Sequence, residues 1–343
     1  MSRIGIAMVG LGPGSEPHVK SLHDLADRVD VRWAVSRTEA RWPDFRKRAS
    51  FPLTTDLAAA IADPSVHAVM VLSPPSAHLD AAELAFAAGK HVLVEKPLEL
   101  TVARAERLVQ AGRTANRRLG VVLQQRFRPA GIRLRALLAE GRLGTVVQAA
   151  MHVPWWRPQA YYDEPGRGTL ARDGGGVLLT QAIHTLNMFL SLVGGRRVIA
   201  AQAGTSALHR METEDYANAL IELGNGAPGV ITATTAAYNG RPERIEIVGT
   251  LGTAILEGAS LRAKFLDGTE ESVISEERTG GGASIMDFPH DAHRAVLIDF
   301  LGAIAESRDP KVTGEDALET QRFIDAILAA GLNRPPAAPR DPG

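Results

Sequence analysis

The sequence has no cysteine among its 343 residues. That absence excludes disulfide bonds, thiolate catalysis and cysteine-ligated zinc or iron–sulfur centres, and it fits a reducing compartment such as the cytoplasm. An excess of charge of one sign is also missing, because 38 Lys and Arg residues balance 39 Asp and Glu residues, a formal net charge of −1. Such a chain has no overall basic field to attract nucleic acid or an anionic membrane. We therefore expect a cytoplasmic protein with neither kind of partner.

Long apolar runs are missing as well. The N-terminal stretch MSRIGIAMVG lacks the longer apolar core and the small-residue cleavage site of a secretory signal. The most apolar long segment, residues 177–193, is interrupted by Thr180, Gln181, His184 and Asn187. We therefore expect no membrane span. The composition, 45% hydrophobic and 22% charged, is that of a globular protein, and the length allows two domains.

The first part of the chain alternates strand-like and helix-like segments. The run VHAVMVL is almost continuously apolar, as parallel strands covered on both faces are. Strands are expected at 4–10, 31–35, 66–72, 91–94 and 119–123, and helices at 15–26, 55–62, 76–89 and 101–116, with Ser76 capping the third helix. This regular order predicts a doubly wound parallel sheet.

Beyond residue 125 the pattern changes, and strands follow one another. Helices are expected at 129–140, 175–193, 291–307 and 315–330, and strands at 197–203, 217–223, 229–236, 244–248 and 253–256. Strands in series predict a largely antiparallel open sheet. The chain is thus predicted to be an α/β protein with a Rossmann domain at 1–123, an α+β substrate-binding and oligomerisation domain at 124–335, and a disordered tail at 336–343. Gly280–Gly282 is predicted to be a mobile loop.

The first predicted strand runs into the turn GLGPGS, residues 10–15. In a Rossmann turn, Gly10 permits the tight bend, and Gly12 lets the backbone approach a pyrophosphate. Pro13 and Gly14 follow, and Ser15 stands where the third small residue lets helix and strand pack closely. The fingerprint is imperfect, and a plain structural turn is the alternative. Its place between a strand and a helix favours dinucleotide binding.

The end of the second predicted strand bears on the choice of dinucleotide. NAD selection uses a carboxylate there, to accept from the ribose 2′-hydroxyl. This strand ends instead in Ser36 and Arg37. A hydroxyl beside a guanidinium suits a 2′-phosphate, which Arg grips with two hydrogen bonds. The alternative is a solvated surface arginine. The sequence favours NADP(H) and leaves NAD(H) open.

Two further predicted strands end in polar or turn-forming residues. One ends in Ser73 and Pro74, and the other in Glu95, Lys96 and Pro97. A charged pair at the end of a buried strand is costly unless something uses it. Ligands of doubly wound sheets bind along the carboxyl edge, so Lys96 is expected to project toward the cofactor.

The predicted helix 175–193 carries a polar stripe on an apolar surface. Thr180, His184, Asn187 and Ser191 recur at helical spacing, which places them on one face. This pattern favours a helix that lines a cleft, and a satisfied core histidine is the alternative. Gly174–Gly176 before it would let the backbone approach something closely and leave helix N–H groups free.

Several stretches together resemble the Gfo/Idh/MocA family of NAD(P)-dependent oxidoreductases. They are GLGPGS (10–15), SPPSAH (73–78), VEKPLEL (94–100), YYDEPGRGTLARDGGGVLLTQAIH (161–184), HRAVLIDFLGAI (293–304) and PKVTGEDAL (310–318). The resemblance covers nearly the whole chain, and the EKP tripeptide followed by GGG and then His is its most specific mark.

The resemblance implies roles for particular residues. Lys96 matches the family's catalytic lysine, His184 matches its histidine, which binds or protonates the substrate hydroxyl, and Pro97 is expected to follow a cis peptide bond. The expected cofactor-binding residues are Gly10, Gly12, Pro13, Gly14, Ser15, Ser36, Arg37, Ser73, Pro74, His78, Glu95, Lys96 and Pro97. The expected substrate-binding residues are Lys96, Arg167, Thr180, His184 and Asn187. No metal is expected, because no compact group of histidines and carboxylates is visible in the sequence.

The chain departs from the family pattern at three positions. Thr180 stands where an acidic or amide residue is frequent, Asn187 where Asp is frequent, and Gly166 where Trp is common. Neither Thr180 nor Asn187 can act as a base, so proton transfer is left to Lys96 and His184. The pocket is expected to be shaped by Trp155, Trp156, Tyr161, Tyr162 and Arg167, for which ordinary packing is the alternative.

The resulting prediction is an NAD(P)-dependent dehydrogenase that oxidises or reduces a secondary alcohol or ketone of a sugar, cyclitol or nucleotide-sugar, with Lys96 and His184 as acid/base pair. Two alternatives stay open. MDFPHDAHRAV (286–296) suggests a cis-dihydrodiol dehydrogenase of aromatic catabolism, and a non-catalytic NAD(P)-binding sensor is the other. A sensor would tend to lose the lysine or the histidine, and this chain keeps both. The resemblance also implies a homodimer or homotetramer formed through the open face of the C-terminal sheet.

Overall fold

The computed structural model describes residues 3–277 and 289–332. The predicted loop at Gly280–Gly282 and the predicted tail lie outside these ranges.

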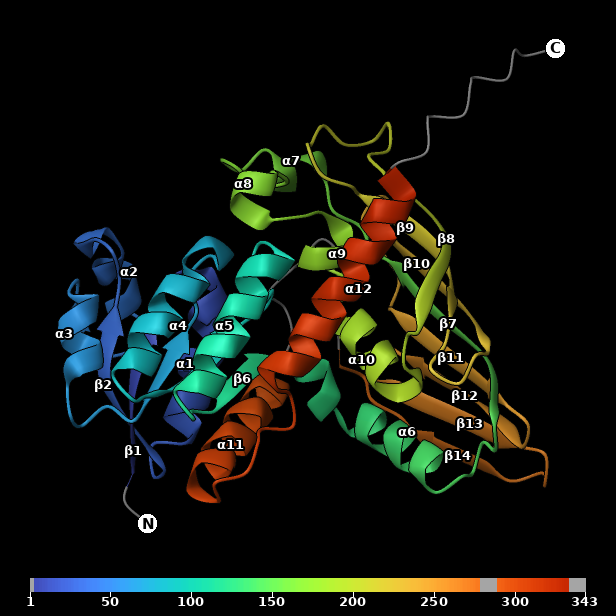
Figure 1. Ribbon diagram of the computed structural model, residues 1–343, viewed down its shortest axis with the longest axis horizontal. Helices are drawn as coiled ribbons and strands as arrows, with labels where there is room; N and C mark the ends of the chain where they lie inside the picture. The colour runs from blue at the N-terminus through green and yellow to red at the C-terminus, as the bar shows by residue number, and fades with distance from the viewer. Residues whose placement is uncertain (1–2, 278–288, 333–343) are drawn as a thin grey trace.

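The N-terminal part folds around a parallel six-stranded sheet in the order β3-β2-β1-β4-β5-β6 (Figure 1). Its central strand β4, AVMV, is fully buried, which explains the continuous apolar run in the sequence. The strands are β1 (Ile4–Val9), β2 (Val29–Val35), β3 (Leu53–Thr54), β4 (Ala68–Val71), β5 (His91–Glu95) and β6 (Leu119–Val122). The helices are α1 (Glu16–Asp24), α2 (Trp42–Arg46), α3 (Leu57–Ala62), α4 (His78–Ala87) and α5 (Val102–Thr114). The predicted doubly wound sheet is confirmed.

Capping residues fix where several of these helices begin. Thr101 accepts a hydrogen bond from the Arg104 N–H and starts α5, and Asp56 does the same for α3 through the Ala59 N–H. The predicted cap at Ser76 is wrong. Residues 75–77 form a short tight turn, and Ala77 precedes α4 without any side-chain cap.

The C-terminal part is built on an eight-stranded sheet in the order β14-β13-β12-β11-β7-β10-β9-β8. Neighbouring strands are antiparallel except β10 and β7. The strands are β7 (Val146–Pro154), β8 (Arg197–Gly204), β9 (Tyr216–Glu222), β10 (Pro228–Thr234), β11 (Arg244–Gly249), β12 (Gly252–Glu257), β13 (Ser260–Phe265) and β14 (Glu270–Val273). The mostly antiparallel sheet was predicted, whereas β7, β13 and β14 were not.

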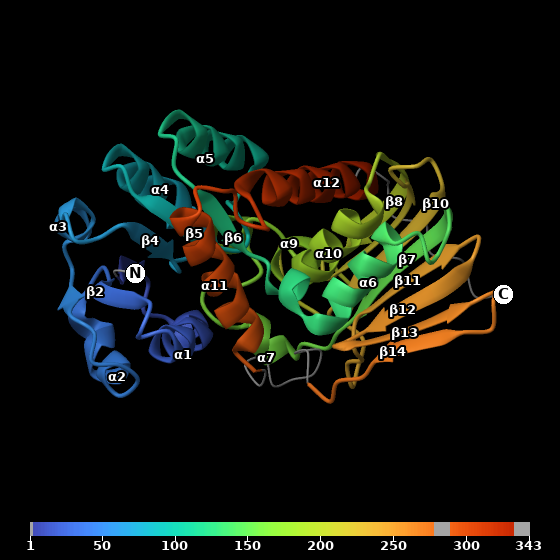
Figure 2. The ribbon, with the colours of Figure 1, turned by 90° about the horizontal axis from the view of Figure 1, so that it is seen from below.

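Helices cover one face of this second sheet (Figure 1). The remaining helices are α6 (Pro129–Ala139), α7 (Gln159–Tyr162), α8 (Leu170–Asp173), α9 (Val177–Thr180), α10 (Ile183–Val193), α11 (Asp291–Ala305) and α12 (Gly314–Leu332). Helices α6, α10 and α12 lie on the sheet, whereas α11 packs beside α1 of the first part (Figure 2). The last part of the chain thus returns to the N-terminal sheet.

The predicted single helix at 175–193 is wrong, because the chain bends between α9 and α10. The Ala182 N–H bonds to the carbonyl of Val177, five residues back, so the turn widens there. The Thr180 hydroxyl also donates to the Gly176 carbonyl. The axes of Leu170–Thr180 and Ile183–Val193 differ by 50°.

Within the described ranges, no single helix is long and apolar enough to cross a membrane. The bent pair Leu170–Thr180 and Ile183–Val193 meets the requirement only when its two arms are taken together.

Candidate active site

The glycine turn after β1 has the conformation that its sequence predicts. Gly10 has φ +108°, and a Cβ there would lie 2.6 Å from the Leu72 carbonyl carbon, so only glycine fits. At Gly12 and Gly14 a Cβ would meet no atom within 4 Å. The Ser15 hydroxyl is buried and donates to the Gly12 carbonyl at 2.7 Å. The turn is therefore packed against Leu72 at Gly10 and open at Gly12 and Gly14, as the approach of a pyrophosphate requires.

An arginine that the sequence did not single out also holds this turn. Arg48 donates to the Leu11 carbonyl at 3.0 Å and to Glu16 at 3.2 Å. It lies between α2 and β3, far along the chain from the turn, so only the fold reveals the contact.

A cavity of about 400 Å³ lies at the carboxyl edge of the first sheet, between that edge and the helices α9 and α10. Seven of the predicted site residues line it: Gly14, Ser73, Glu95, Lys96, Arg167, Thr180 and His184. Residues that the sequence did not single out line it too: Pro17, Leu72, Gln124, Gln125, Arg128, Arg157, Gln181 and His293. The edge of a parallel sheet collects loops from distant segments, so these residues have no common spacing in the sequence.

Lys96 stands at the end of β5, immediately before a cis peptide bond to Pro97, as the resemblance implied. Its Nζ donates to the carbonyl of Thr180 at 2.9 Å, which ties the first sheet to the end of α9. Burial lowers the pKa of the Lys96 amine; the Glu95 carboxylate opposes this and Arg157 adds to it. A lysine with a lowered pKa can take up and release a proton closer to neutral pH.

His184 lies in the first turn of α10 and reaches the same cavity. Burial, with the nearby charge of Lys96, lowers the pKa of His184 well below its usual value. The ring is therefore neutral at physiological pH and can offer one N–H donor and one acceptor. Its Nδ1 is buried and has no hydrogen-bond partner within residues 3–277 and 289–332.

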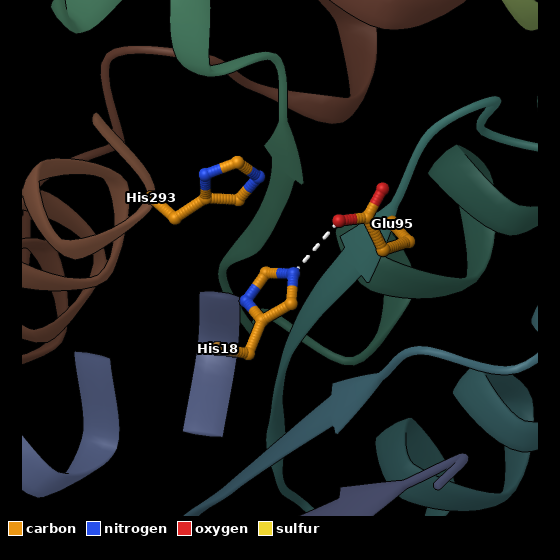
Figure 3. Close-up of side chains that lie close together, drawn as sticks. All are labelled: His18, Glu95 and His293. Carbon is orange, nitrogen blue, oxygen red and sulfur yellow. Dashed lines mark hydrogen bonds and ion pairs between the residues drawn. The ribbon is translucent and has the colours of Figure 1, made fainter. Parts of the chain in front are cut away.

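Both oxygens of the Glu95 carboxylate have hydrogen-bond partners other than the Lys96 amine. Its Oε1 accepts a hydrogen bond from His18 Nε2 at 2.7 Å, and its Oε2 accepts from the backbone N–H of Lys96 at 3.0 Å. His293 of α11 lies beside His18, and both rings turn toward the carboxylate (Figure 3). We call His18, Glu95 and His293 the histidine–glutamate cluster. No motif or spacing in the sequence predicts such a compact group.

The spacing within the cluster is that of a hydrogen bond and not of a metal site. The donor atoms of its three residues lie within 4.8 Å of one another. Two ligands of a tetrahedral zinc ion, each bound at about 2.1 Å, lie about 3.4 Å apart. The 2.7 Å between His18 Nε2 and Glu95 Oε1 is shorter and holds a proton. We therefore assign the pair as a hydrogen-bonded contact.

Three predictions about the site need correction. Asn187 does not line the cavity, because its amide is buried and donates to Thr320 of α12 at 2.9 Å. His78 is also buried, between the carbonyls of Ser73 and Pro97, so it fixes the two strand ends instead of contacting a cofactor.

The third correction concerns the glycine triplet. Its helix N–H groups are not free, because the buried Glu214 accepts from the N–H groups of Gly176 and Leu178 at 2.9 and 3.2 Å. A Cβ at Gly176 would lie 1.9 Å from the Glu214 carbonyl oxygen. The close approach that Gly176 permits is therefore to Glu214.

Aromatic residues form one wall of the cavity. Trp155 and Tyr161 line it, and Tyr161 carries Arg167 over its ring at 4.1 Å and accepts from the same guanidinium at 2.7 Å. Trp156 and Tyr162 do not reach the cavity, since Trp156 packs on Tyr238 and the Tyr162 hydroxyl bonds to Thr235. Trp156 and Tyr162 therefore have the alternative role, ordinary packing, instead of shaping the pocket.

The end of β2 presents an exposed arginine beside an engaged hydroxyl. Ser36 donates to the Thr38 carbonyl at 2.8 Å and accepts from Trp42 Nε1 at 2.9 Å. Arg37 is exposed at this edge. The serine would have to turn its hydroxyl to meet a phosphate, whereas the arginine is accessible.

Polar atoms buried around the cavity fit a polar ligand. Ser73 Oγ, Gln124 Oε1, Trp155 Nε1 and His184 Nδ1 have no hydrogen-bond partner within the described part of the chain. Together with the open glycine turn, they suit a nicotinamide dinucleotide and a hydroxylated substrate placed end to end.

Two family models match most of the chain. Residues 4–123 match the "Oxidoreductase family, NAD-binding Rossmann fold" model, and residues 132–255 match the "GFO/IDH/MocA C-terminal domain" model.

Individual relatives extend the similarity over nearly the full length. The chain is 26% identical to myo-inositol 2-dehydrogenase of Thermotoga maritima, over 92% of this chain and 91% of that protein. The WlbA dehydrogenase from Bordetella pertussis, solved in complex with NADH and UDP-GlcNAcA, is 25% identical with a TM-score of 0.81, over 97% of each chain. Levoglucosan dehydrogenase, solved with NADH and levoglucosan, is 21% identical with a TM-score of 0.85, over 96% of this chain and 98% of that one, and it supports the fold alone.

Proposed function

The chain belongs to the GFO/IDH/MocA family of NAD-binding oxidoreductases, and from that premise we propose that it interconverts a secondary alcohol and a ketone on a sugar, cyclitol or nucleotide-sugar. One observation carries the proposal. Lys96, from the carboxyl edge of the first sheet, and His184, from a helix of the second part, reach the same polar cavity. Their side chains have the chemistry for moving one proton to or from a hydroxyl group.

The bound dinucleotide supplies the hydride acceptor or donor. In the oxidation direction, the neutral amine of Lys96 accepts the proton of the substrate hydroxyl. The O–H electron pair becomes the second bond of the ketone as the carbinol hydrogen leaves as hydride. His184, neutral and fixed on α10, donates a hydrogen bond to the same oxygen or accepts one from it. In reduction, the protonated lysine returns the proton.

The surroundings of Lys96 Nζ support this assignment of roles. The Thr180 carbonyl is the hydrogen-bond acceptor that holds Lys96 Nζ in the site. Thr180 cannot itself take a proton, and Asn187 faces away, so neither competes with the lysine as a base. We retain Arg167, Thr180, His184 and Lys96 as substrate-facing residues.

We further propose NADP(H) as the preferred cofactor, with NAD(H) as a substitute. Support comes from the exposed guanidinium of Arg37 at the end of β2, where a carboxylate would instead favour NAD. The solved relatives carry NADH in their structures. A comparison of kcat/KM for the two oxidised cofactors decides between them.

The experiment is to follow absorbance of the reduced nicotinamide with each cofactor and a panel of inositols, aldoses, uronic acids, UDP-sugars and aromatic cis-dihydrodiols. Each active substrate is then repeated with Lys96→Met, which we expect to lower kcat by about 10² or more, the contribution of an acid/base group. Cofactor binding should persist in this variant. Near-normal turnover would refute the lysine as base, and activity confined to the dihydrodiols would replace the sugar-like substrate.

A homo-oligomer is also proposed, formed through the face of the second sheet that is opposite to α6, α10 and α12. The support is a row of small and apolar side chains on that face, formed by Ala150, Ala200, Leu220 and Val230.

A further inference from the structure

The Glu95 carboxylate, next to Lys96, belongs to a cluster whose three residues come from separate parts of the chain. His18 comes from α1, Glu95 from β5 and His293 from α11. The His18 and His293 rings meet edge to face, with centroids 5.2 Å apart and planes at 90° (Figure 3). His293 thus fixes the orientation in which His18 presents its Nε2 to Glu95.

This arrangement keeps the carboxylate and the amine of adjacent residues apart. The two oxygens of Glu95 are engaged by His18 and by the Lys96 backbone, whereas Lys96 Nζ is engaged by the Thr180 carbonyl. No direct bond joins Glu95 to Nζ within residues 3–277 and 289–332. An unrestrained carboxylate beside a buried amine would pair with it, because such a charge-assisted bond is strong.

The cluster also fixes a negative charge near the lysine. Burial alone would raise the pKa of Glu95, but the hydrogen bond from His18 and the nearby charge of Lys96 bring it to about 2. Burial lowers the pKa of His293 to about 3, so that ring is neutral and acts through packing.

Other charged groups face the lysine from the surrounding elements. They are Arg157 after β7, Arg167 before α8 and Asp173 at the end of α8, with the neutral His184 from α10. Of these groups, Glu95 has the largest electrostatic effect on the amine, and it opposes the loss of the lysine proton that burial favours. Where the Glu95 carboxylate is held therefore matters for the lysine.

We propose that His18 and His293 are positioning residues that hold the Glu95 carboxylate away from the Lys96 amine and so keep Lys96 available as the proton acceptor. This inference rests on the proposed role of Lys96 as base. It assigns the first helix and the helix α11 a part in the chemistry although neither carries a reacting group.

The test measures the protonation of Lys96 itself. The sequence has six lysines, so [¹³Cε]lysine NMR gives few signals, and Lys96→Met identifies the one that belongs to Lys96. Glu95→Gln removes the negative charge and should move the titration midpoint of Lys96 down by about one pH unit. His18→Leu frees the carboxylate to pair with the amine and should move it up by a similar amount. The two variants therefore shift the same signal in opposite directions.

Two further variants separate positioning from packing. His18→Gln keeps an N–H donor at similar reach and should stay near the wild-type midpoint. His290→Gln is the matched control, because His290 pairs with Asp24 at 2.8 Å at the same α1–α11 contact and is not part of the cluster. It should leave the midpoint unchanged.

The pH dependence of the oxidation rate should move with the NMR midpoints. The rate should rise at lower pH in Glu95→Gln and at higher pH in His18→Leu than in the wild type. Equal midpoints in wild type and His18→Leu, or shifts of both variants in one direction, would overturn the proposal. Saturable Zn²⁺ binding in calorimetry that Glu95→Gln abolishes would also overturn it, in favour of a metal site. If Lys96→Met retained turnover, the proposed function would fail, whereas the NMR midpoints would still decide whether the cluster positions Glu95.

Discussion

In the glycine turn after β1, Gly10 and Gly12 are glycines for different physical reasons. Gly10 is required by the fold itself, because its φ of +108° and the nearby Leu72 backbone exclude any side chain. Gly12 has open space where its Cβ would stand. The protein itself therefore does not require glycine at this position, and we attribute it to the approach of the proposed dinucleotide.

This difference predicts opposite outcomes for two alanine substitutions. Gly12→Ala should keep the melting temperature of the wild type and weaken dinucleotide binding at least about tenfold, since the added methyl group occupies the approach of the pyrophosphate. Gly10→Ala should lower the melting temperature, because its Cβ would lie 2.6 Å from backbone atoms of Leu72. Thermal melts and cofactor fluorescence titrations measure the two effects. Unchanged cofactor affinity in Gly12→Ala would remove the turn from the binding site.

The residues that the sequence identified were those that a short motif brings together. Lys96 ends an apolar strand, and His184 recurs in register with Thr180, so both are visible in one reading of the chain. His18 and His293 lie near opposite ends of the chain and meet only because α11 packs beside α1. No periodicity or spacing records such a contact.

Among the elements, the bend between α9 and α10 sets how Thr180 of α9 lies relative to the polar residues of α10. A straight helix would place Thr180, His184 and Asn187 on one face. The wider turn at Ala182 changes the direction of the chain after Thr180. Within α10, His184 in the first turn lines the cavity, whereas Asn187, one turn later, meets α12. The sequence predicted the helical period but could not predict the break, because the break depends on where the two arms pack.

Strand β5, which immediately precedes Lys96, begins with His91. This histidine makes the contact between β5 and β6 sensitive to acid. His91 Nδ1 accepts from the Arg118 N–H at 3.0 Å, and burial, with Arg117 and Arg118 nearby, lowers the pKa of His91 to about 4. The unfolded chain protonates this ring at about pH 6.5. Its contribution to stability is complete above pH 6.5 and is lost progressively as the pH falls toward 4.

We therefore expect His91→Asn to melt with a shallower pH dependence than the wild type between pH 7 and 4.5. Asparagine keeps an acceptor for the Arg118 N–H and does not titrate. The control is His23→Asn, at an exposed position near the end of α1, which should melt in parallel with the wild type. Calorimetric melts across this range make the comparison, and parallel curves for His91→Asn and the wild type would contradict it.

For the whole molecule, α11 returns to the N-terminal part, where it packs beside α1 and against β6 (Figure 2). Lys96 reaches across to Thr180, and His293 reaches back to the histidine–glutamate cluster. The site is thus assembled from both halves of the chain. The alternation of strands and helices in the first half, and most of the strands in the second, could be predicted from the sequence. How the halves meet could not be predicted, because the connecting contacts join residues from segments with no shared pattern.

In the described ranges, one face of the second sheet carries no helix. A row of aligned apolar residues runs over four of its strands, β8, β9, β10 and β7, on that face. Strand pairing places Ala200 beside Leu220, Leu220 beside Val230, and Val230 beside Ala150. Leu220 is 53% exposed in the single chain. An aligned apolar row on an open sheet face suits contact with a second copy of the same surface, where each row packs against its equivalent.

We expect Leu220→Asp to dissociate the oligomer without unfolding the protomer. Like charges would meet across a symmetric contact, whereas the buried side chains of β9 and its strand pairing stay in place. The matched control is Leu266→Asp, which is 79% exposed in the turn after β13, away from this row. Sedimentation velocity at micromolar concentration should show the wild type and the control as oligomers, and Leu220→Asp as a monomer with an unchanged melting temperature. A wild type that is monomeric under these conditions would contradict the proposed contact, and a Leu220→Asp variant that stays oligomeric would place the contact elsewhere on the surface.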